Sequence, residues 1–264
     1  MQTNRQFSAA TPRSFWRWIS TIALLVAVAA HAGLTKETIG KHTCYVYVPE
    51  KLSTPAPLLM LFHGSGRDGM SQINEWRKLA DKEGIVLAAP NSTDTRYWNI
   101  PDDGPELLRD IAAFLGKQRP IDQRRIYAFG HSAGAVFMLN MAPLESDLFA
   151  AVAVHAGQFA NAAASGMLRF AERKIPIFIV VGTKDPYFSV AFVRETKAAF
   201  ATEGIPVETR EIEGHDHNYY RRSAEINDMV WKFLSPKRLD SDAHYSNYTI
   251  TKSGEAVSIL PADQ

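Results

Sequence analysis

The sequence is poor in the features that mark several classes of protein. Its one cysteine, Cys44, cannot form an internal disulfide or supply a zinc cluster. Lys and Arg number 29 against 28 Asp and Glu, so no basic stripe indicates a nucleic-acid partner and no acidic tail indicates disorder. Cys44 itself lies in the alternating, strand-like run Thr43–Val48, which favours a packed structural thiol over a nucleophile.

The sequence also lacks an apolar run long enough to cross a membrane with ease. Arg5, Arg13 and Arg17 precede an apolar run over Trp18–Ala30, which is shorter than the roughly twenty residues of a membrane helix. Ala30-His31-Ala32 then gives the small-x-small pattern of a cleavage site. We therefore expect the first 32 residues to be a signal peptide and the protein to be secreted or periplasmic, with no stable membrane insertion after cleavage. An uncleaved anchor is the alternative.

The remainder has the size and pattern of one catalytic domain. The chain has 264 residues, 46% of them hydrophobic and 22% charged, and shows no internal repeat or low-complexity linker. Short apolar runs alternate with amphipathic segments, which predicts an α/β fold with a mostly parallel sheet covered by helices on both faces. Strands are expected at 43–48, 58–62, 85–90, 125–129, 150–154, 175–181 and 207–212, and helices at 71–82, 105–115, around 136–141, 188–200 and 218–234. We place this domain at 33–240 and a polar tail at 241–264, whose stretch Tyr248–Thr251 is either an added edge strand or a loose end.

Gly130-His131-Ser132-Ala133-Gly134 has the form G-x-S-x-G, after an expected strand and before an expected helix. In that context the serine sits on a tight, strained turn that projects its hydroxyl, and the glycines avoid collisions with the neighbouring strand and helix. We predict Ser132 as a nucleophile and the backbone N–H of Ala133 as an oxyanion donor. The alternative is an inert glycine turn.

A second oxyanion donor is expected from the loop His63-Gly64-Ser65-Gly66, which follows the strand 58–62. Its small residues allow the backbone to approach a substrate closely. We assign the donor to the N–H of Ser65, with Gly66 as the competing choice. His63 precedes the nucleophile in the chain, and we interpret it as a histidine that braces the loop.

In this kind of fold the catalytic acid and base follow the nucleophile in that order. Asp185 comes just after the strand 175–181, where a carboxylate can orient an imidazole, and we predict it as the acid. Asp147 comes too early in the chain for this role, because it lies in a loop before another strand. The base should follow the last strand, and there Gly214-His215-Asp216-His217 offers both His215 and His217. Spacing alone leaves both open. No further ligands at useful spacing indicate a metal site, and the chemistry requires no cofactor.

Several of these motifs together resemble the polyhydroxybutyrate depolymerase and feruloyl-esterase-type group of the α/β-hydrolases. They are Ile121–Tyr127 leading into the Ser132 turn, Tyr45–Pro49, the His63-Gly64 loop, Phe149–Val152 and Gly182–Pro186, and the resemblance spans roughly 41–234. It implies an α/β-hydrolase fold with a small lid or none. The sequence departs from the group at Ala135, where a third glycine is usual. The segment His215–Tyr220 also resembles the Asp-His-Ser-Tyr-Tyr turn of S-formylglutathione hydrolases, and that likeness favours His217 as the base.

The resemblance implies an exported serine esterase that acts on short hydroxyalkanoate or hydroxycinnamate-type esters, small or polymeric. Trp98 and Tyr187 fall in loops after strands, and we predict that they line the substrate pocket, with core or surface packing as the alternative. A peptidase or amidase with the same catalytic residues, and a non-catalytic exported binding protein, are the competing functions.

Overall fold

The computed structural model describes residue 1 and residues 32–159, 167–244, 248–250 and 256–258. The predicted signal peptide therefore lies almost wholly outside the described residues. Within them, the main sheet has eight strands in the order β1-β2-β4-β3-β5-β6-β7-β8. These are β1 Gly33–Ile39, β2 His42–Val48, β3 Ala56–Phe62, β4 Val86–Pro90, β5 Ile121–His131, β6 Ala151–His155, β7 Ile177–Gly182 and β8 Val207–Ile212. The six strands β3 to β8 are parallel to one another, whereas β1 and β2 are antiparallel strands at one edge of the sheet.

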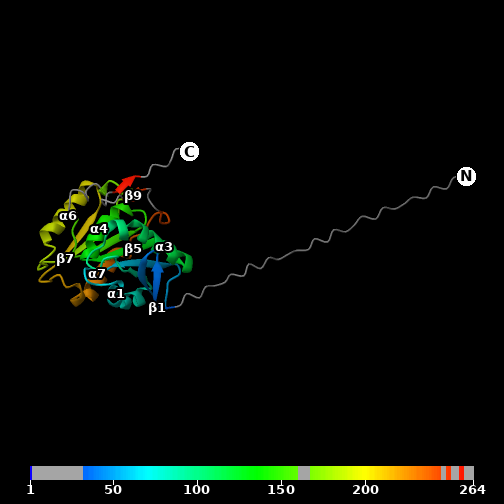
Figure 1. Cartoon of the computed structure of the whole chain (residues 1–264), viewed down its shortest axis with the longest axis horizontal. Coiled ribbons are helices and arrows are strands. Elements are labelled where there is room, and N and C mark those ends of the chain that lie inside the picture. Colours follow the sequence, from blue (N-terminus) through cyan, green and yellow to red (C-terminus); the bar gives the residue numbers. More distant parts are fainter. Residues whose placement is uncertain (2–31, 160–166, 245–247, 251–255, 259–264) are drawn as a thin grey trace.

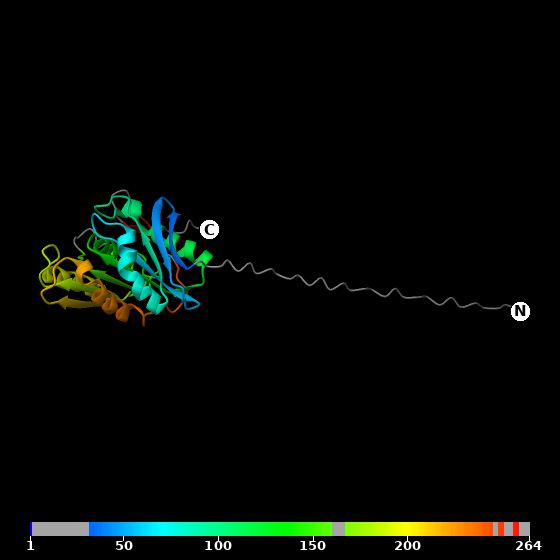
Figure 2. The same cartoon turned by 90° about the horizontal axis from the view of Figure 1, so that it is seen from below.

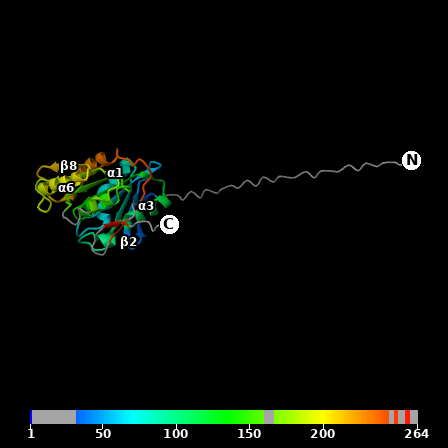
Figure 3. The ribbon, with the colours of Figure 1, turned by 90° about the horizontal axis from the view of Figure 1, so that it is seen from above.

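Helices cover both faces of the sheet, as Figures 1 and 2 show. One face carries α1 Gly69–Glu83 and α7 Ser223–Leu234, which pack against each other; the other carries α3 Pro105–Gln118, α4 Ala133–Leu144 and α6 Val190–Thr202. The view in Figure 3 separates α6 and α3, at the β8 and β2 ends of the sheet respectively. Alternate residues of β3 enter the two cores: Leu59 packs on the α1 side and Met60 on the α4 side. The predicted α/β fold, with a mostly parallel sheet between helices, is confirmed.

Most of the expected elements are present with small changes at their ends. Strand β1 was not expected, because its sequence GLTKETI does not alternate apolar and polar residues, although its burial alternates regularly in the structure. Helix α1 begins two residues before the expected start at Ser71, where the sequence offered Ser71 itself as a possible N-cap. Asp68 is the N-cap instead, because its side chain accepts the Ser71 N–H, and Gly84 ends the helix in the left-handed conformation. The expected last helix from residue 218 divides into a short 3₁₀ turn, Tyr219–Arg221, and α7.

The C-terminal segment packs on the domain but does not extend the main sheet. Strand β9, Tyr248–Ile250, pairs with β10, Ala256–Ser258, in a separate two-stranded sheet. Tyr248 is buried and its hydroxyl donates to the buried carboxylate of Glu145, just after α4. For residues 248–250, neither an edge strand added to the main sheet nor a loose end is therefore found, and residue 251 of the predicted stretch lies outside the described residues.

Trp76 provides a test of the α1 face, because it is fully buried and contacts Phe129 of β5 with ring centroids 5.1 Å apart. We expect Trp76→Ala to lower the free energy of unfolding by about 3–5 kcal/mol, since it removes a large aromatic side chain from a packed core. Urea unfolding followed by fluorescence measures the change. Phe192→Ala, at an exposed position of α6, is the matched control and should stay within about 0.5 kcal/mol of the parent. A small loss for Trp76→Ala would mean that the α1 face is not packed as described.

Candidate active site

Ser132 stands on a strained turn between β5 and α4. Its backbone has φ 54° and ψ −115°, a sparsely populated conformation for a residue with a side chain. Two glycines allow this turn: a Cβ on Gly130 would lie 2.3 Å from the carbonyl oxygen of Gly134, and a Cβ on Gly134 would lie 2.3 Å from that of Phe62. The Ser132 N–H donates to the carbonyl of His155 at 3.0 Å, which fixes the turn to the end of β6.

Ala135 occupies the place where the resembled group has a third glycine. A side-chain carbon at Gly157, which follows β6, would lie 2.5 Å from the Ala135 Cβ. The absence of a side chain at Gly157 therefore makes room for the methyl group of Ala135. This complementary pair explains how the turn accepts alanine.

The structure places the side chains of Ser132, His217 and Asp185 in one hydrogen-bonded row. The Ser132 Oγ lies 2.9 Å from Nε2 of His217, and Nδ1 of His217 lies 2.8 Å from Oδ2 of Asp185. An ionised carboxylate only accepts, so Nδ1 carries the proton and Nε2 is left to accept the serine hydroxyl. This is the geometry that a nucleophile, a general base and an orienting carboxylate require.

Asp185 is held in its charged form by its neighbours. Burial by itself would raise the pKa of this carboxyl, but hydrogen bonds from His217 and from the N–H groups of Phe188 and Tyr187 outweigh it and lower the pKa below its usual value. The negative charge that orients the His217 ring is thus maintained at neutral pH.

The loop that carries His217 is fixed to the end of β7. The Lys184 N–H donates to the carbonyl of His215 at 2.9 Å, and the Gly214 N–H donates to the Thr183 hydroxyl at 2.9 Å. Gly182 permits this approach, because a Cβ there would lie 2.1 Å from the His215 carbonyl oxygen. The backbone thereby fixes the distance between the acid and the imidazole.

The structure separates the two histidines that the sequence left open. His215 does not contact Ser132 or Asp185 by a hydrogen bond; its Nε2 lies 3.1 Å from Nε2 of His155. His155 in turn lies with its Nδ1 3.0 Å from Nδ1 of His131, so the three imidazoles form a buried chain behind the turn. His131 also lies against His217, with ring centroids 5.2 Å apart.

Burial lowers the pKa of every member of this histidine chain. The pKa of His131 falls to about 3 because of burial and the nearby His217, that of His155 falls well below its ordinary value, and that of His215 falls through burial and the nearby Arg222. The chain is therefore neutral at physiological pH. Nothing in the sequence apart from the number of histidines indicated it, because its members come from three separate segments.

The loop after β3 closes over the Ser132 turn. A Cβ on Gly64 would lie 3.2 Å from the Ser132 Cβ, so the loop backbone passes directly beside Ser132. The Gly66 N–H donates to the carbonyl of Thr95 at 2.7 Å and is thus engaged. In the part of the chain that the structure describes, the N–H groups of Ser65 and Ala133 have no acceptor. These two are the donors that remain available for an oxyanion.

His63 braces the loop from within the core. The Ser92 N–H donates to its Nε2 at 3.1 Å, which leaves Nδ1 protonated to donate to the carbonyl of Gly64 at 3.0 Å. Trp98 supports the same residue, because its indole N–H donates to the His63 carbonyl at 2.9 Å and its ring packs on Phe62 and Phe137. Trp98 is buried and does not line the cleft, in contrast to its expected place in the substrate pocket.

A cleft of about 620 Å³ opens above Ser132 and His217. Tyr187 lines it and is 68% exposed, with its ring edge-to-face on His217 at 4.9 Å between centroids. The guanidinium of Arg67 also lines the cleft, over the Tyr220 ring at 4.7 Å. The lining also includes Gly64, Ser65, His131, Pro186, Phe188, Asp216 and Asn218. The cleft thus combines aromatic surface with a few polar groups, as ligand sites do.

Cys44 is fully buried in β2, and burial raises the pKa of its thiol to about 12. A thiol in this state is unreactive at neutral pH. Among the described residues, no helix is long and apolar enough to span a bilayer.

Comparisons with known proteins give a consistent class. The sequence model of the dienelactone hydrolase family matches residues 94–245. A bifunctional acetylxylan esterase/xylanase of Neocallimastix patriciarum is 26% identical over 231 residues, covering 74% of this chain and 33% of that protein. A poly(3-hydroxybutyrate) depolymerase of Ralstonia pickettii is 24% identical, covering 55% and 39% respectively, and feruloyl esterases are also matched. The chain thus spans about a third to two-fifths of the length of these relatives.

The acetyl xylan esterase of Aspergillus awamori has a similar structure, with a TM-score of 0.64 at 15% identity, covering 77% of this chain and 99% of that one. This similarity confirms the α/β-hydrolase fold. The relatives confirm the resemblance to the depolymerase and feruloyl-esterase-type group.

The histidine chain predicts a loss of stability in mild acid. The pKa of His131 is about 3 in the folded state, below the 6.5 of a free histidine. As pH falls below 6.5, the unfolded chain binds a proton at this residue and the folded chain does not, which favours unfolding. At pH 5 the free energy of unfolding is lower by about 2 kcal/mol on account of His131. Urea unfolding at pH 7.5 and pH 5.0 measures it.

A His131→Asn variant isolates this effect from other groups. Glu145 has a raised pKa through burial and acts in the opposite direction, but it is common to both proteins. We expect the stability of the variant to fall by about 2 kcal/mol less than that of the parent between the two pH values. Equal losses would show that His131 does not stay neutral in the folded state.

Proposed function

Because this chain belongs to the dienelactone hydrolase family, we propose that it is a serine hydrolase of carboxylic esters that acts through Ser132. The observation that carries the proposal is the row Ser132–His217–Asp185, with contacts of 2.9 and 2.8 Å, whose Ser132 and His217 line the cleft. The names of the relatives, all ester hydrolases, support the same reaction class. The row alone would also suit an amidase, and the relatives favour esters.

The reaction proceeds in two acyl-transfer steps. His217 takes the proton of Ser132 as the hydroxyl oxygen attacks the ester carbonyl, and the resulting imidazolium then protonates the leaving alcohol. Water enters, gives its proton to His217 and attacks the acyl-enzyme, which releases the acid and restores Ser132. Asp185 remains ionised and holds the ring with Nδ1 protonated.

The tetrahedral intermediates carry a negative oxygen that needs donors already in place. The N–H groups of Ala133 and Ser65 are suited to this role because no acceptor among the described residues engages them. One such donor contributes roughly 3–4 kcal/mol to stabilising the transition state. The bonds that fix His63 and Gly66 hold the loop so that its N–H groups need not reorganise.

The substrates we propose are short hydroxyalkanoate or hydroxycinnamate-type esters, either as small molecules or as part of a polymer. Tyr187 and Phe188 offer aromatic surface beside His217, which suits a flat or apolar acyl group. We further propose that the catalytic domain is 33–240 and that residues 1–32 direct export to the periplasm or outside the cell. The export proposal rests on the arginines and the apolar run of the sequence alone.

The first test is the hydrolysis of p-nitrophenyl acetate, butyrate and octanoate by the parent and by variants at the three positions. We expect Ser132→Ala and His217→Ala to lower kcat/KM on the order of 10⁴-fold or more, because each removes a member of a unit that acts together. His215→Ala, the matched control two residues from His217, should stay within about tenfold of the parent, since His215 contacts His155 instead. If His215→Ala abolished activity and His217→Ala did not, the assignment of the base would be wrong.

Two outcomes of the same experiment would favour the competing functions. A folded parent that cleaves p-nitroanilides but no esters would indicate an amidase. A parent that cleaves neither, and whose Ser132 is not labelled by a fluorophosphonate, would indicate a binding protein on a hydrolase scaffold.

Tyr187 is the aromatic residue whose removal should change substrate selection. We expect Tyr187→Ala to raise KM for aromatic acyl esters about three- to tenfold with little change in kcat, because an exposed ring beside His217 binds the ground state and the transition state alike. Tyr97→Ala, which removes a ring that is 50% exposed and outside the cleft, is the control and should leave KM unchanged. An unchanged KM for Tyr187→Ala with every ester would exclude the ring from the pocket.

A further inference from the structure

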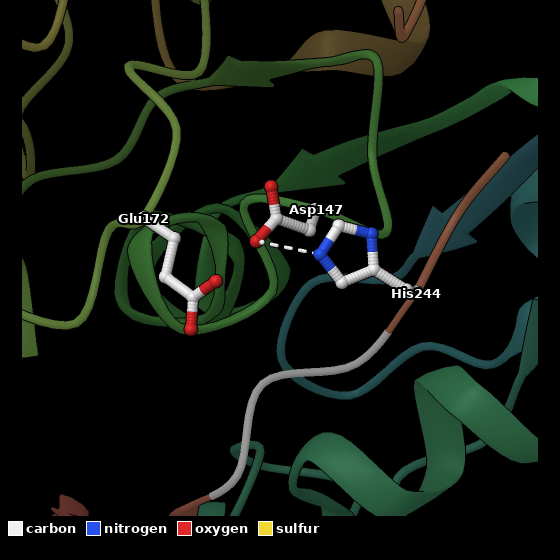
Figure 4. Close-up of side chains that lie close together, drawn as sticks. All are labelled: Asp147, Glu172 and His244. Atoms are coloured by element: carbon white, nitrogen blue, oxygen red, sulfur yellow. Dashed lines mark ion pairs between the residues drawn. The ribbon is translucent and has the colours of Figure 1, made fainter. Parts of the chain in front are cut away.

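Three side chains from distant parts of the sequence meet near the N-terminal ends of β6 and β7, at the opposite end of these strands from the cleft. Asp147 lies between α4 and β6, Glu172 precedes β7, and His244 follows α7; one donor atom from each lies within 4.8 Å of the others. Figure 4 shows Asp147 between the other two. Since Ser132 adjoins the far end of β6, the five residues of that strand put about 16 Å between this cluster and the catalytic row.

Asp147 has a buried carboxylate oxygen to which no group in the described part of the chain donates a hydrogen bond. Its side chain is about nine-tenths buried, and its Oδ2 has no hydrogen-bond partner among the described residues. A buried carboxylate oxygen in this state is costly unless a cation compensates it. The nearby guanidinium of Arg173 does not fill the role, because it donates to the carbonyls of Ser146, Phe149 and Ala150.

The spacing of the donors fits a shared metal ion better than a direct contact. The Nε2 of His244 lies 3.5 Å from Oδ2 of Asp147, which is long for a charged hydrogen bond. Two ligands bound to the same tetrahedral Zn²⁺ at its usual bond lengths stand about 3.4 Å apart. The exposed Glu172 is free to complete the set by rotation of its side chain.

The two carboxyl groups lie close together. A divalent cation bound between them would compensate the negative charge of both.

We propose that Asp147, Glu172 and His244 form a structural Zn²⁺ site that fastens the C-terminal segment to the domain. A histidine with two carboxylates suits a transition metal, whereas Ca²⁺ and Mg²⁺ prefer sites made of oxygen alone. The His244 N–H donates to the carbonyl of Asp147 at 3.3 Å, so the backbone already holds the imidazole beside its partner. Water completes a four-coordinate shell.

The test is a titration of the metal-stripped full chain with Zn²⁺ by calorimetry, together with the shift in Tm. We compare the parent with His244→Ala and Glu172→Gln, two changes at exposed positions that leave the core intact, and with Glu203→Gln as a matched control at an exposed site elsewhere. We expect one Zn²⁺ per chain and a rise in Tm for the parent and for Glu203→Gln. The Kd should weaken at least tenfold in His244→Ala and in Glu172→Gln, with ester hydrolysis unchanged.

Three results would overturn the site. One is the absence of Zn²⁺ binding to the parent at micromolar metal, and another is an equal Kd in all four proteins, which would place the bound ion elsewhere. The third is a Tm rise with Ca²⁺ as large as with Zn²⁺ that His244→Ala does not diminish, because the imidazole would then not be a ligand. None of these results depends on the proposed esterase activity.

Discussion

The geometry of the candidate active site depends on the close backbone contact among β3, β5 and α4. The turn at Ser132 has a positive φ, a strained state that costs about 1–3 kcal/mol and persists only because its surroundings leave no alternative. Gly130 and Gly134 let the three segments approach to distances that any side chain would prevent. The same contact brings Gly64 beside Ser132, so one packing constraint positions both the serine and the loop that faces it. The His155 carbonyl adds a tie from the turn itself to the end of β6, because it accepts the Ser132 N–H.

The sequence was sufficient for the parts of the fold that have a local pattern. Buried strands such as β3 and β7 read as apolar runs, and the turn at Ser132 carries its own glycine signature. The end of α1 was also predictable, because Gly84 adopts the left-handed conformation that glycine favours. The start of α1 was not, since Asp68 and Ser71 are both good N-caps and only the backbone geometry distinguishes them.

Features that depend on distant contacts could not be predicted in the same way. Trp98 lies in a loop after a strand, as pocket residues often do, yet its indole turns inward to the His63 carbonyl. The histidines at 215 and 217 have similar neighbours in sequence, and only the position of the loop on β7 decides which one reaches Ser132. The grouping of Asp147, Glu172 and His244 has no sequence spacing that would reveal it. In each case the deciding information is which segments the fold brings side by side.

The histidine chain has a consequence for proton order. His131 and His155 meet through Nδ1 atoms, and His155 and His215 meet through Nε2 atoms. A neutral imidazole has a single N–H, so when His155 donates at one nitrogen it must accept at the other. The N–H groups of the histidine chain can therefore point in either of two directions along it. One ring cannot move its proton to the other nitrogen unless the other two rings do so as well. Since His131 borders the cleft and His215 is the far end, a change of hydrogen bonding beside Arg222 would alter whether His131 presents a donor or an acceptor near Ser132, with no movement of the backbone.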